Sequence, residues 1–169
     1  MVLLGKVFQD WLQLYSRLHN MNIKEVDWQD ALDTAWFLEK YHKEVGWDHF
    51  TINYDKTYNQ VISSITNEDE QVLVAKEGDQ IIGVAWSLCM KPFFSDDLMI
   101  ENLLVYVDKD KRGGMAGPRL MRHIKKWGKA RGAKAVKIGT ISEINTARTK
   151  GLFRKMGYRE VGSHFMTEL

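Results

Sequence analysis

Cysteine is almost absent from this sequence. Cys89 is the single cysteine among 169 residues. One cysteine excludes an internal disulfide framework and a metal site built from several cysteines, and it fits a reducing compartment. We therefore expect no disulfide and no bound metal, and we expect Cys89 to pack in the core rather than to act as a nucleophile.

Long hydrophobic runs are absent as well. No stretch approaches the roughly 18 apolar residues that a membrane-spanning helix needs. The first 20 residues are interrupted by Lys6 and Asp10 and lack a small-residue cleavage site, so they do not resemble a signal peptide. The composition, 44% hydrophobic and 27% charged, is typical of a soluble globular protein. We expect one domain over residues 1–169, located in the cytoplasm and without a membrane partner.

The chain has little net charge, but the charge is unevenly distributed. The formal net charge of +2 combines −10 over residues 24–101, +11 over residues 102–169 and +1 over the first 23 residues. A basic half suggests a polyanionic ligand such as a nucleotide or a cofactor, and an acidic half suggests a cationic ligand. Alternatively, the two halves mix in space and their separation in sequence has no functional meaning.

Hydrophobic periodicity predicts a mixed α/β fold. An amphipathic helix is expected over residues 2–18, either packed on the domain or mediating self-association. Asp27 is the expected N-cap of the next helix. The elements that follow the first helix are strand 22–26, helix 27–46, helix 55–65, a hairpin of strands 71–76 and 80–90, strand 98–107, helix 117–131, strand 134–140, helix 143–156 and strand 158–167. Antiparallel strands come first and β-α-β crossovers later, so the sheet should be mixed.

The stretch from Glu101 to Arg131 carries the most chemical information. It comprises a buried strand, a charged turn that continues as Arg-Gly-Gly-Met-Ala-Gly from residue 112 to 117, and an amphipathic helix. Glycines let a backbone approach a ligand closely, and a helix N-terminus offers unpaired N–H groups and a favourable dipole. Taken alone, the turn is equally consistent with an anion site and with a plain strand–helix connection.

Two motifs at matching separation resemble the GNAT superfamily of acyl-CoA N-acyltransferases over residues 22–168. In the first, Val107 ends the strand five residues before Arg112, and Gly117 takes the last glycine of the family's Arg/Gln-x-x-Gly-x-Gly/Ala motif. In the second, residues 145–158 resemble the family's Asn…Ala…Leu-Tyr…Gly-Phe helix, with one extra residue. The glycine turn and the Pro-Phe-Phe segment at 92–94 also resemble acetyltransferase-like proteins encoded by bacteriophages.

The resemblance implies a GNAT-like central mixed sheet with helices on both faces, and acetyl-CoA as the acyl donor. The amphipathic helix expected from hydrophobic spacing would form an N-terminal extension over 1–20. Backbone N–H groups of the turn would hold the pyrophosphate, Arg119 would be a further phosphate contact, and the family uses the asparagine of the second motif near the pantetheine arm. The implied cofactor-binding residues are Leu104, Val105, Val107, Arg112, Gly113, Gly114, Met115, Ala116, Gly117, Asn145, Lys150 and Phe153.

Acyl transfer to an amine needs a deprotonated nucleophile, because an alkyl ammonium has a pKa of about 10.4. Glu101 is our candidate base or amine-binding residue, since the family often places an acidic residue at this point of the strand. Strand alternation puts Glu101 on the same side as Val105 and Val107, barring a bulge. Tyr106 and Tyr158 are candidate acids, although the thiolate can also leave without one. The acceptor is expected to be a small-molecule or peptide amine, and the acidic first half of the chain favours a cationic one.

Two departures from the family pattern leave a second interpretation open. Met115 replaces a preferred glycine, so the backbone there must suit a residue with a Cβ atom. Phe153 stands where many members have the tyrosine that protonates the thiolate. The leading prediction is an N-acetyltransferase that uses a direct, ternary-complex mechanism, acting as a monomer or homodimer. The alternatives are a CoA-binding regulatory protein with little turnover and a nucleic-acid-binding protein, although the basic helix positions fit an ordinary polar face better.

Overall fold

The computed structural model of the chain describes residues 21–47, 49–140 and 144–162. The helix predicted over residues 2–18 and the second half of the last predicted strand lie outside the described residues. No helix in the described part of the chain has the length and hydropathy needed to cross a membrane.

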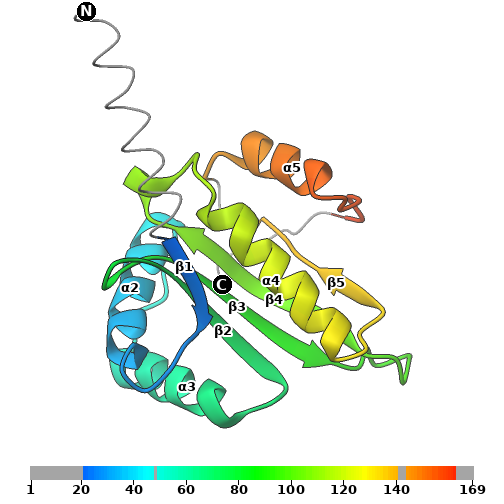
Figure 1. The fold of residues 1–169 in the computed structure, drawn as a ribbon, viewed down its shortest axis with the longest axis horizontal. Coiled ribbons are helices and arrows are strands. Elements are labelled where there is room, and N and C mark those ends of the chain that lie inside the picture. Colours follow the sequence, from blue (N-terminus) through cyan, green and yellow to red (C-terminus); the bar gives the residue numbers. More distant parts are fainter. Residues whose placement is uncertain (1–20, 48, 141–143, 163–169) are drawn as a thin grey trace, which may run out of the picture.

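A single five-stranded sheet organises the described residues (Figure 1). Its strands lie in chain order: β1 (Met21–Glu25), β2 (Glu70–Glu77), β3 (Gln80–Met90), β4 (Met99–Val107) and β5 (Ala135–Lys137). The first four strands pair antiparallel, and β5 joins β4 in parallel. The parallel pair requires a crossover, which the helix between β4 and β5 supplies. The prediction of a mixed α/β sheet is therefore confirmed.

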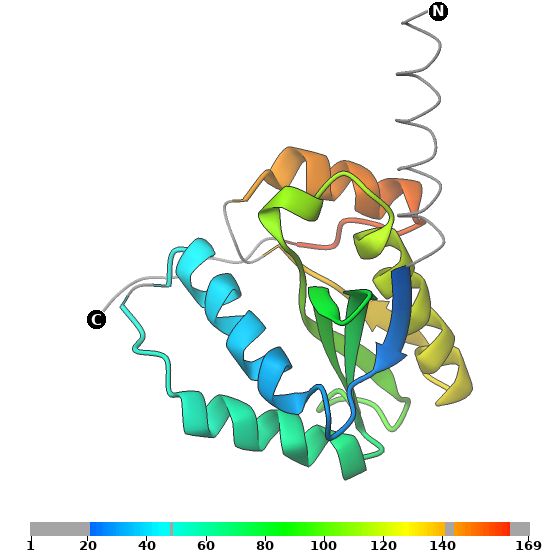
Figure 2. The ribbon, with the colours of Figure 1, turned by 60° about the vertical axis from the view of Figure 1, so that its left-hand side comes forward.

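Helices cover both faces of the sheet (Figure 2). Helices α2 (Ala31–Glu44) and α3 (Tyr54–Thr66) pack on one face, and α4 (Ala116–Ala130) packs on the other. A short 3-10 turn, η1 (Lys109–Lys111), leads from β4 towards α4, and α5 (Thr146–Lys155) follows β5. Figure 1 shows α5 beside the start of α4, close to the end of β4. Each helix confirms its sequence prediction to within a few residues.

The two faces bury separate hydrophobic clusters. Leu120 and Ile124 of α4 are fully buried against the first cluster. Phe37 and Val61, from α2 and α3, belong to the second cluster on the opposite face. Strand alternation explains this division, because successive side chains of a strand point to opposite faces and the strands here are apolar on both. Cys89 is buried in the α4 cluster, as predicted.

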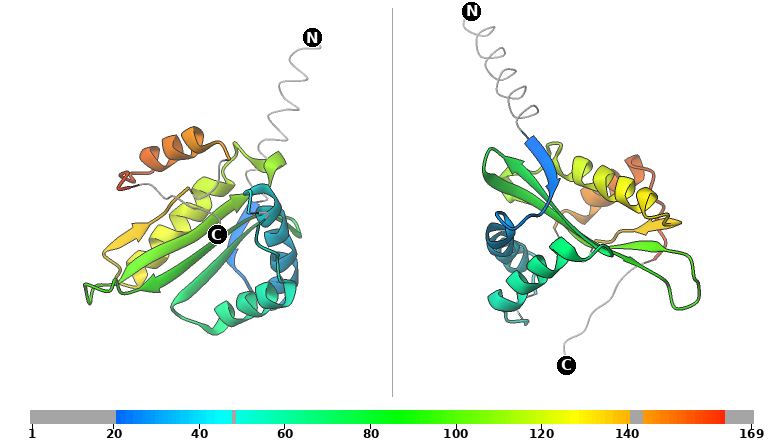
Figure 3. Two further views of the ribbon diagram at one scale, coloured as in Figure 1. Left: turned by 180° about the vertical axis from the view of Figure 1, so that it is seen from behind. Right: turned by 60° about the horizontal axis from the view of Figure 1, so that its bottom comes forward.

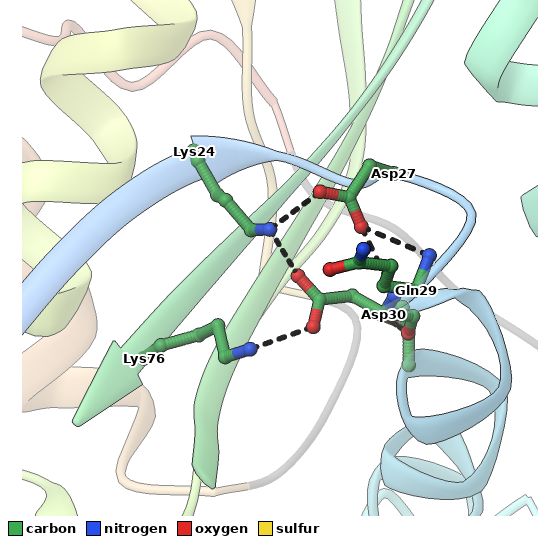
Figure 4. Close-up of polar contacts among 6 residues, drawn as sticks. Lys24, Asp27, Gln29, Asp30 and Lys76 are labelled. Carbon is green, nitrogen blue, oxygen red and sulfur yellow. Dashed lines mark hydrogen bonds and ion pairs between the residues drawn. The ribbon is translucent and has the colours of Figure 1, made fainter. Parts of the chain in front are cut away.

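The start of α2 differs from its prediction. The helix begins at Ala31 with Asp30 as its N-cap, three residues after the predicted cap. The Asp27 carboxylate instead accepts hydrogen bonds from the backbone N–H groups of Gln29 and Asp30, both at 3.1 Å, and so stabilises the turn that precedes the helix. Figure 4 shows the buried Asp30 carboxylate between Lys24 of β1 and Lys76 of β2, each at 2.6 Å. This network joins two strands to α2.

The last part of the chain also differs from its prediction. Strand β5 spans three residues rather than the seven expected, and residues 158–162 form no strand. The backbone N–H of Tyr158 donates to the Phe153 carbonyl at 3.0 Å, so the chain turns back on α5 instead of extending. A strand next to β5 is therefore not formed by the described part of this segment.

Candidate active site

A β-bulge interrupts the central strand at Leu103. Asn102 pairs with Ser87 of β3, but the next paired residue, opposite Trp86, is Leu104. The buried Asn102 amide nitrogen lies 2.9 Å from the Trp86 carbonyl, 3.0 Å from Ser87 Oγ and 3.0 Å from the Leu104 carbonyl. The Asn102 amide thus donates to backbone carbonyls that the bulge leaves without a partner in the strand pairing.

The bulge changes which residues share a face of β4. Ile100 packs in the α4 cluster together with Val105 and Val107, whereas Leu104 and Tyr106 pack in the α2–α3 cluster. Because the side chains of Ile100 and Glu101 must point to opposite faces, Glu101 lies on the face away from α4. The expectation that Glu101 shares a face with Val105 and Val107 was therefore wrong, and the bulge is the reason.

Strands β4 and β5 separate directly after Glu101. The last paired residues are Glu101 and Lys137, and β4 continues to Val107 without β5 beside it. We call this point the fork. Lys137 Nζ lies 3.0 Å from Glu101 Oε1, and the two side chains are 45% and 25% exposed. Figure 3, left, shows β4 and β5 from this face, with α2 and α3 to one side of them.

The glycine turn has the conformation of a ligand cradle. Gly113 has a φ of +90°, which a residue with a Cβ atom rarely adopts. Met115 has φ −93° and ψ −4°, an ordinary helical conformation, so the departure from glycine at this position causes no strain. The turn leads directly into α4 at Ala116. The backbone at Met115 therefore suits a residue with a Cβ atom, as the sequence requires.

The N-terminus of α4 has no side-chain cap. The first hydrogen bond of the helix runs from the backbone N–H of Arg119 to the Met115 carbonyl, at 2.9 Å. The N–H groups of Ala116 and Gly117 come before it and have no acceptor within the helix, whereas Pro118 has no N–H to satisfy. The helix dipole adds about half a positive charge at this end. The loop therefore fits a phosphate group, with backbone N–H groups as the donors.

The Arg112 side chain does not point to this cradle. Its Nη1 and Nη2 atoms lie 2.6 Å and 2.5 Å from the two carboxylate oxygens of Glu44, at the end of α2. Its Nε donates to the Val107 carbonyl at 2.9 Å. The Arg112 guanidinium holds the pKa of Glu44 below its usual range. Arg112 thus fastens the loop to α2 in this structure, and a contact between its side chain and the phosphates stays a prediction.

Tyr106 belongs to the same network and is poorly suited to the role of an acid. Its hydroxyl donates to the Glu44 carboxylate at 2.7 Å, and its ring lies 5.3 Å from the Arg112 guanidinium. Burial, and next the hydrogen bond to Glu44, raise the pKa of Tyr106 well above its ordinary value. The hydroxyl faces α2 on the far side of the strand from α4. The structure therefore speaks against the predicted catalytic role of Tyr106 and gives it a packing role.

Helix α5 presents the second motif. Asn145 precedes it with a left-handed φ of 45°, which asparagine tolerates better than most residues, and its side chain does not cap the helix. Lys150 and Arg154 both pair with Glu160, at 2.5 Å and 2.9 Å. Lys150 thus has a carboxylate partner in this structure, and its contact with a phosphate stays a prediction. Phe153 packs on Tyr158 with ring centroids 5.9 Å apart.

A pocket of about 380 Å³ lies between α5, the end of β5 and the segment that follows α5. Its wall includes the predicted site residues Lys150 and Phe153, and also Lys137 from the fork. The pocket places the second motif next to the strand that separates from β4. The fork near the start of β4, the glycine turn beyond its end and α5 thus all lie along the β4–β5 side of the sheet.

Sequence reasoning missed four residues of this site. Asn102 builds the bulge, Glu44 holds the loop, Lys137 pairs with Glu101, and Arg148 of α5 lies over the glycine turn. An ideal Cβ on Gly113 would be 2.9 Å from Arg148 Nη2. Only Asn102 left a sequence signal, since a polar residue inside an apolar strand is unusual. The other three contacts join distant parts of the chain.

Comparisons with known proteins identify the family of the chain. The family model described as "Acetyltransferase (GNAT) domain" matches residues 68–160, which include the hairpin, the glycine turn and both motifs. The chain belongs to the GNAT acetyltransferase family. The match confirms the resemblance to this family and, with it, the enzyme class of an N-acetyltransferase. No curated protein sequence gives a significant match.

Solved structures of GNAT-like proteins share the fold. The aminoglycoside acetyltransferase HMB0005 from an uncultured soil metagenomic sample is 18% identical, with a TM-score of 0.69 over 88% of this chain and 98% of that chain. The soil metagenomic aminoglycoside acetyltransferase meta-AAC0020, solved with sisomicin, is 14% identical, with a TM-score of 0.70 over 89% and 97%. AAC(6')-Iy, solved with a CoA-containing bisubstrate analog, is 16% identical, with a TM-score of 0.67 over 88% and 97%. At these identities the likeness shows the fold alone.

Proposed function

We propose that this GNAT protein transfers an acetyl group from acetyl-CoA to a primary amine by direct attack in a ternary complex. One observation carries the proposal: the strand that carries the Glu101 carboxylate at the fork, β4, leads into the glycine turn at the uncapped start of α4. The first feature suits the phosphates of the cofactor, and the second suits the amine. The family assignment supports both roles.

The residues divide the work in the following way. Backbone N–H groups of the turn, from Gly113 to Gly117, hold the pyrophosphate, and Asn145 faces the pantetheine arm. Acetyl-CoA supplies a thioester whose carbonyl carbon accepts the amine nitrogen. Glu101 accepts the proton that the ammonium must lose, and its position away from α4 leaves it open to an acceptor from that face. A backbone N–H beside the bulge, from Leu104 or Val105, stabilises the oxyanion.

Neither Phe153 nor Tyr106 is placed as a dedicated acid. Phe153 has no proton to give, and the Tyr106 hydroxyl is bonded to Glu44. A thiol has a pKa of about 8.5, so the thiolate can leave and take a proton from water. We therefore propose that the protein works without a general acid.

The test is acetyl-CoA turnover with a panel of primary amines, measured as free thiol. We expect thiol release that depends on the amine and that falls about 100-fold in Glu101→Gln, because a general base contributes roughly 10²–10⁴-fold. Initial rates measured at several concentrations of both substrates should give intersecting reciprocal plots. Parallel plots would indicate an acyl-enzyme and contradict direct attack.

The absence of a suitably placed acid also favours a second candidate, a CoA-binding protein with little turnover. Calorimetry separates the two, because the second candidate binds acetyl-CoA but releases no thiol with any amine. The predicted preference for a cationic acceptor remains a proposal, and Lys137 beside Glu101 weighs against it. The single domain with an extension over residues 1–20, the monomer or homodimer, the cytoplasmic location and the bacteriophage origin also remain proposals.

A further inference from the structure

Helix α5 is weakly anchored to the rest of the described structure. None of its residues is fully buried, in contrast to α4, whose buried residues fill the core. Two contacts hold the segment after it: Lys125 of α4 donates to the Met156 carbonyl at 2.9 Å and lies 4.9 Å from the Tyr158 ring centroid. The first half of α5 meets the loop through Arg148, which lies over Gly113. A helix with so little buried surface gains little stability from packing alone.

The basic side chains around the cradle are nearly all engaged. Lys111 pairs with Glu77 at 2.5 Å, Arg112 pairs with Glu44, and Arg119 donates to the Met21 carbonyl at 2.8 Å. Two basic residues of α5, Lys150 and Arg154, both form ion pairs with Glu160, which follows the helix. Arg148 is exposed and, among the residues that the structure describes, no carboxylate pairs with it. Its guanidinium is therefore a free cation at the turn.

Gly113 and Arg148 fit one another sterically. A Cβ atom at position 113 would lie 2.9 Å from Arg148 Nη2, too close for a real contact. The Arg148 guanidinium ends a flexible side chain that could move aside, so the φ of +90° is what requires the glycine, and the short distance places the guanidinium beside the turn. The neighbouring Gly114 has no comparable restriction, since its nearest atom would be the Lys111 carbonyl oxygen at 3.6 Å.

We propose that Arg148 binds the pyrophosphate of CoA from above the Gly113 turn, so that cofactor binding fastens α5 to the loop. The inference rests on the proposed function, because it assumes that CoA occupies this cradle. The N–H groups at the start of α4 face the anion from one side, and the planar guanidinium adds charge-assisted hydrogen bonds from the other. The cofactor then joins two elements that otherwise share few contacts.

Calorimetric titration with three ligands tests the proposal: CoA, dephospho-CoA, which lacks the 3′-phosphate, and pantetheine, which has no phosphate. We expect Arg148→Gln to weaken CoA and dephospho-CoA by the same factor, about 10- to 100-fold for the loss of charge-assisted bonds, and to leave pantetheine unchanged. Arg148→Lys keeps the charge but loses the planar guanidinium, so its affinity for CoA should lie between those of the wild type and Arg148→Gln. Arg122→Gln, which removes an exposed arginine of α4, is the matched control and should bind like the wild type.

Hydrogen exchange of the α5 backbone provides a second measurement that does not depend on turnover. CoA should slow exchange over residues 146–155 in the wild type and in Arg122→Gln, but not in Arg148→Gln saturated with CoA. Equal CoA affinity in Arg148→Gln and wild type overturns the proposal, and so does a loss that is confined to CoA and spares dephospho-CoA. If the wild type transfers acetyl groups while Arg148→Gln binds normally, this inference alone fails. If the wild type does not bind CoA, the proposed function fails with it.

Discussion

At the scale of single residues, the ion pair at the fork bears on which amines the protein accepts. Lys137 places an ammonium 3.0 Å from the proposed base, where the ammonium of an acceptor would otherwise sit. A cationic acceptor must displace the Lys137 ammonium from Glu101 or bind beside it, where the two positive charges repel each other. The pair is partly exposed, so its energy is of the size of a surface ion pair, up to about 1 kcal/mol.

We predict that Lys137→Met shifts selectivity towards acceptors with a second positive charge. The kcat/KM of a diamine relative to that of a monoamine of equal length should rise about three- to fivefold, since up to about 1 kcal/mol of pairing and repulsion is removed. Lys134→Met, which removes another exposed lysine close to β5, is the control. An unchanged ratio in Lys137→Met would show that Glu101 does not contact the acceptor.

The Tyr106 hydroxyl provides a second test at this scale. Because it donates to Glu44 on the α2 side, Tyr106→Phe should leave kcat within about twofold of the wild type, whereas loss of a general acid costs about 100-fold or more. The hydrogen bond to a charged group should cost about 2 kcal/mol of unfolding free energy. Denaturant unfolding and steady-state rates measure the two effects separately. A large loss of kcat at unchanged stability would return Tyr106 to the role of an acid.

At the scale of elements, the buried Asp30 carboxylate joins β1, β2 and α2. Burial alone would raise the pKa of Asp30, but the hydrogen bonds from Lys24 and Lys76 outweigh it and hold the pKa below its usual range. A group with a lowered pKa in the folded state adds stability above its unfolded pKa of about 3.9, and this stability is lost as the pH falls through the folded pKa. The network should therefore stabilise the fold at neutral pH and fail in acid.

Asp30→Asn should lower the unfolding free energy by about 2 kcal/mol at pH 7, because it removes the carboxylate partner of the mostly buried Lys76 ammonium and leaves Lys24 paired with Asp27 alone. The difference from wild type should shrink below about pH 4, where Asp30 of the wild type is also protonated. Urea unfolding between pH 3 and pH 8 measures this dependence. Asp33→Asn, an exposed carboxylate in the first turn of the same helix, should change little at any pH. A difference that does not vary with pH would mean that the ionised form of Asp30 is not what stabilises the fold.

Helix α4 approaches the sheet through Gly128. A Cβ atom there would lie 2.8 Å from Ile100 Cγ1 and 3.4 Å from Val136 Cγ2. Gly128→Ala should lower the unfolding free energy by about 1–2 kcal/mol, since overpacking at a strand costs more than the helix propensity that alanine gains. Gly151→Ala in α5, where nothing lies within 4 Å, should instead raise it by up to about 1 kcal/mol. Opposite signs for the two variants, measured by chemical unfolding, would verify the close approach.

At the scale of the whole molecule, the sequence predicts the positions of helices and strands better than it predicts the contacts between distant residues. Periodicity located α2, α3, α4 and the strands β1 to β4 to within a few residues, because these elements bury continuous apolar faces. Strand β5 was overestimated, since its three residues carry no distinctive pattern. The bulge at Leu103 was missed and put Glu101 on the wrong face. Arg112 reads as a phosphate ligand in sequence, but its partner Glu44 is 68 residues away and no local pattern reveals it.

The charge separation along the sequence becomes pairing in space. Glu44, Glu77 and Asp69, all from the acidic half, pair with Arg112, Lys111 and Arg131 of the basic half. Lys125 also binds the carbonyl of Met156 instead of extending from α4. These contacts remove several of the basic groups that a nucleic-acid surface would need. They favour the interpretation in which the two halves neutralise each other, and they leave Arg148 as the cation at the cradle.

We therefore predict weak binding of nucleic acid and clear binding of CoA by the same preparation. A fluorescent 20-base-pair duplex should bind with a Kd above about 100 µM at 150 mM salt, weaker than ordinary non-specific DNA binding at about 1–100 µM. Fluorescence anisotropy measures the duplex, and titration with CoA under identical conditions serves as the positive control. Lys126→Gln and Lys129→Gln, on the polar face of α4, should not change the CoA affinity. A micromolar Kd that falls steeply with salt and is lost in these variants would make α4 a nucleic-acid surface instead.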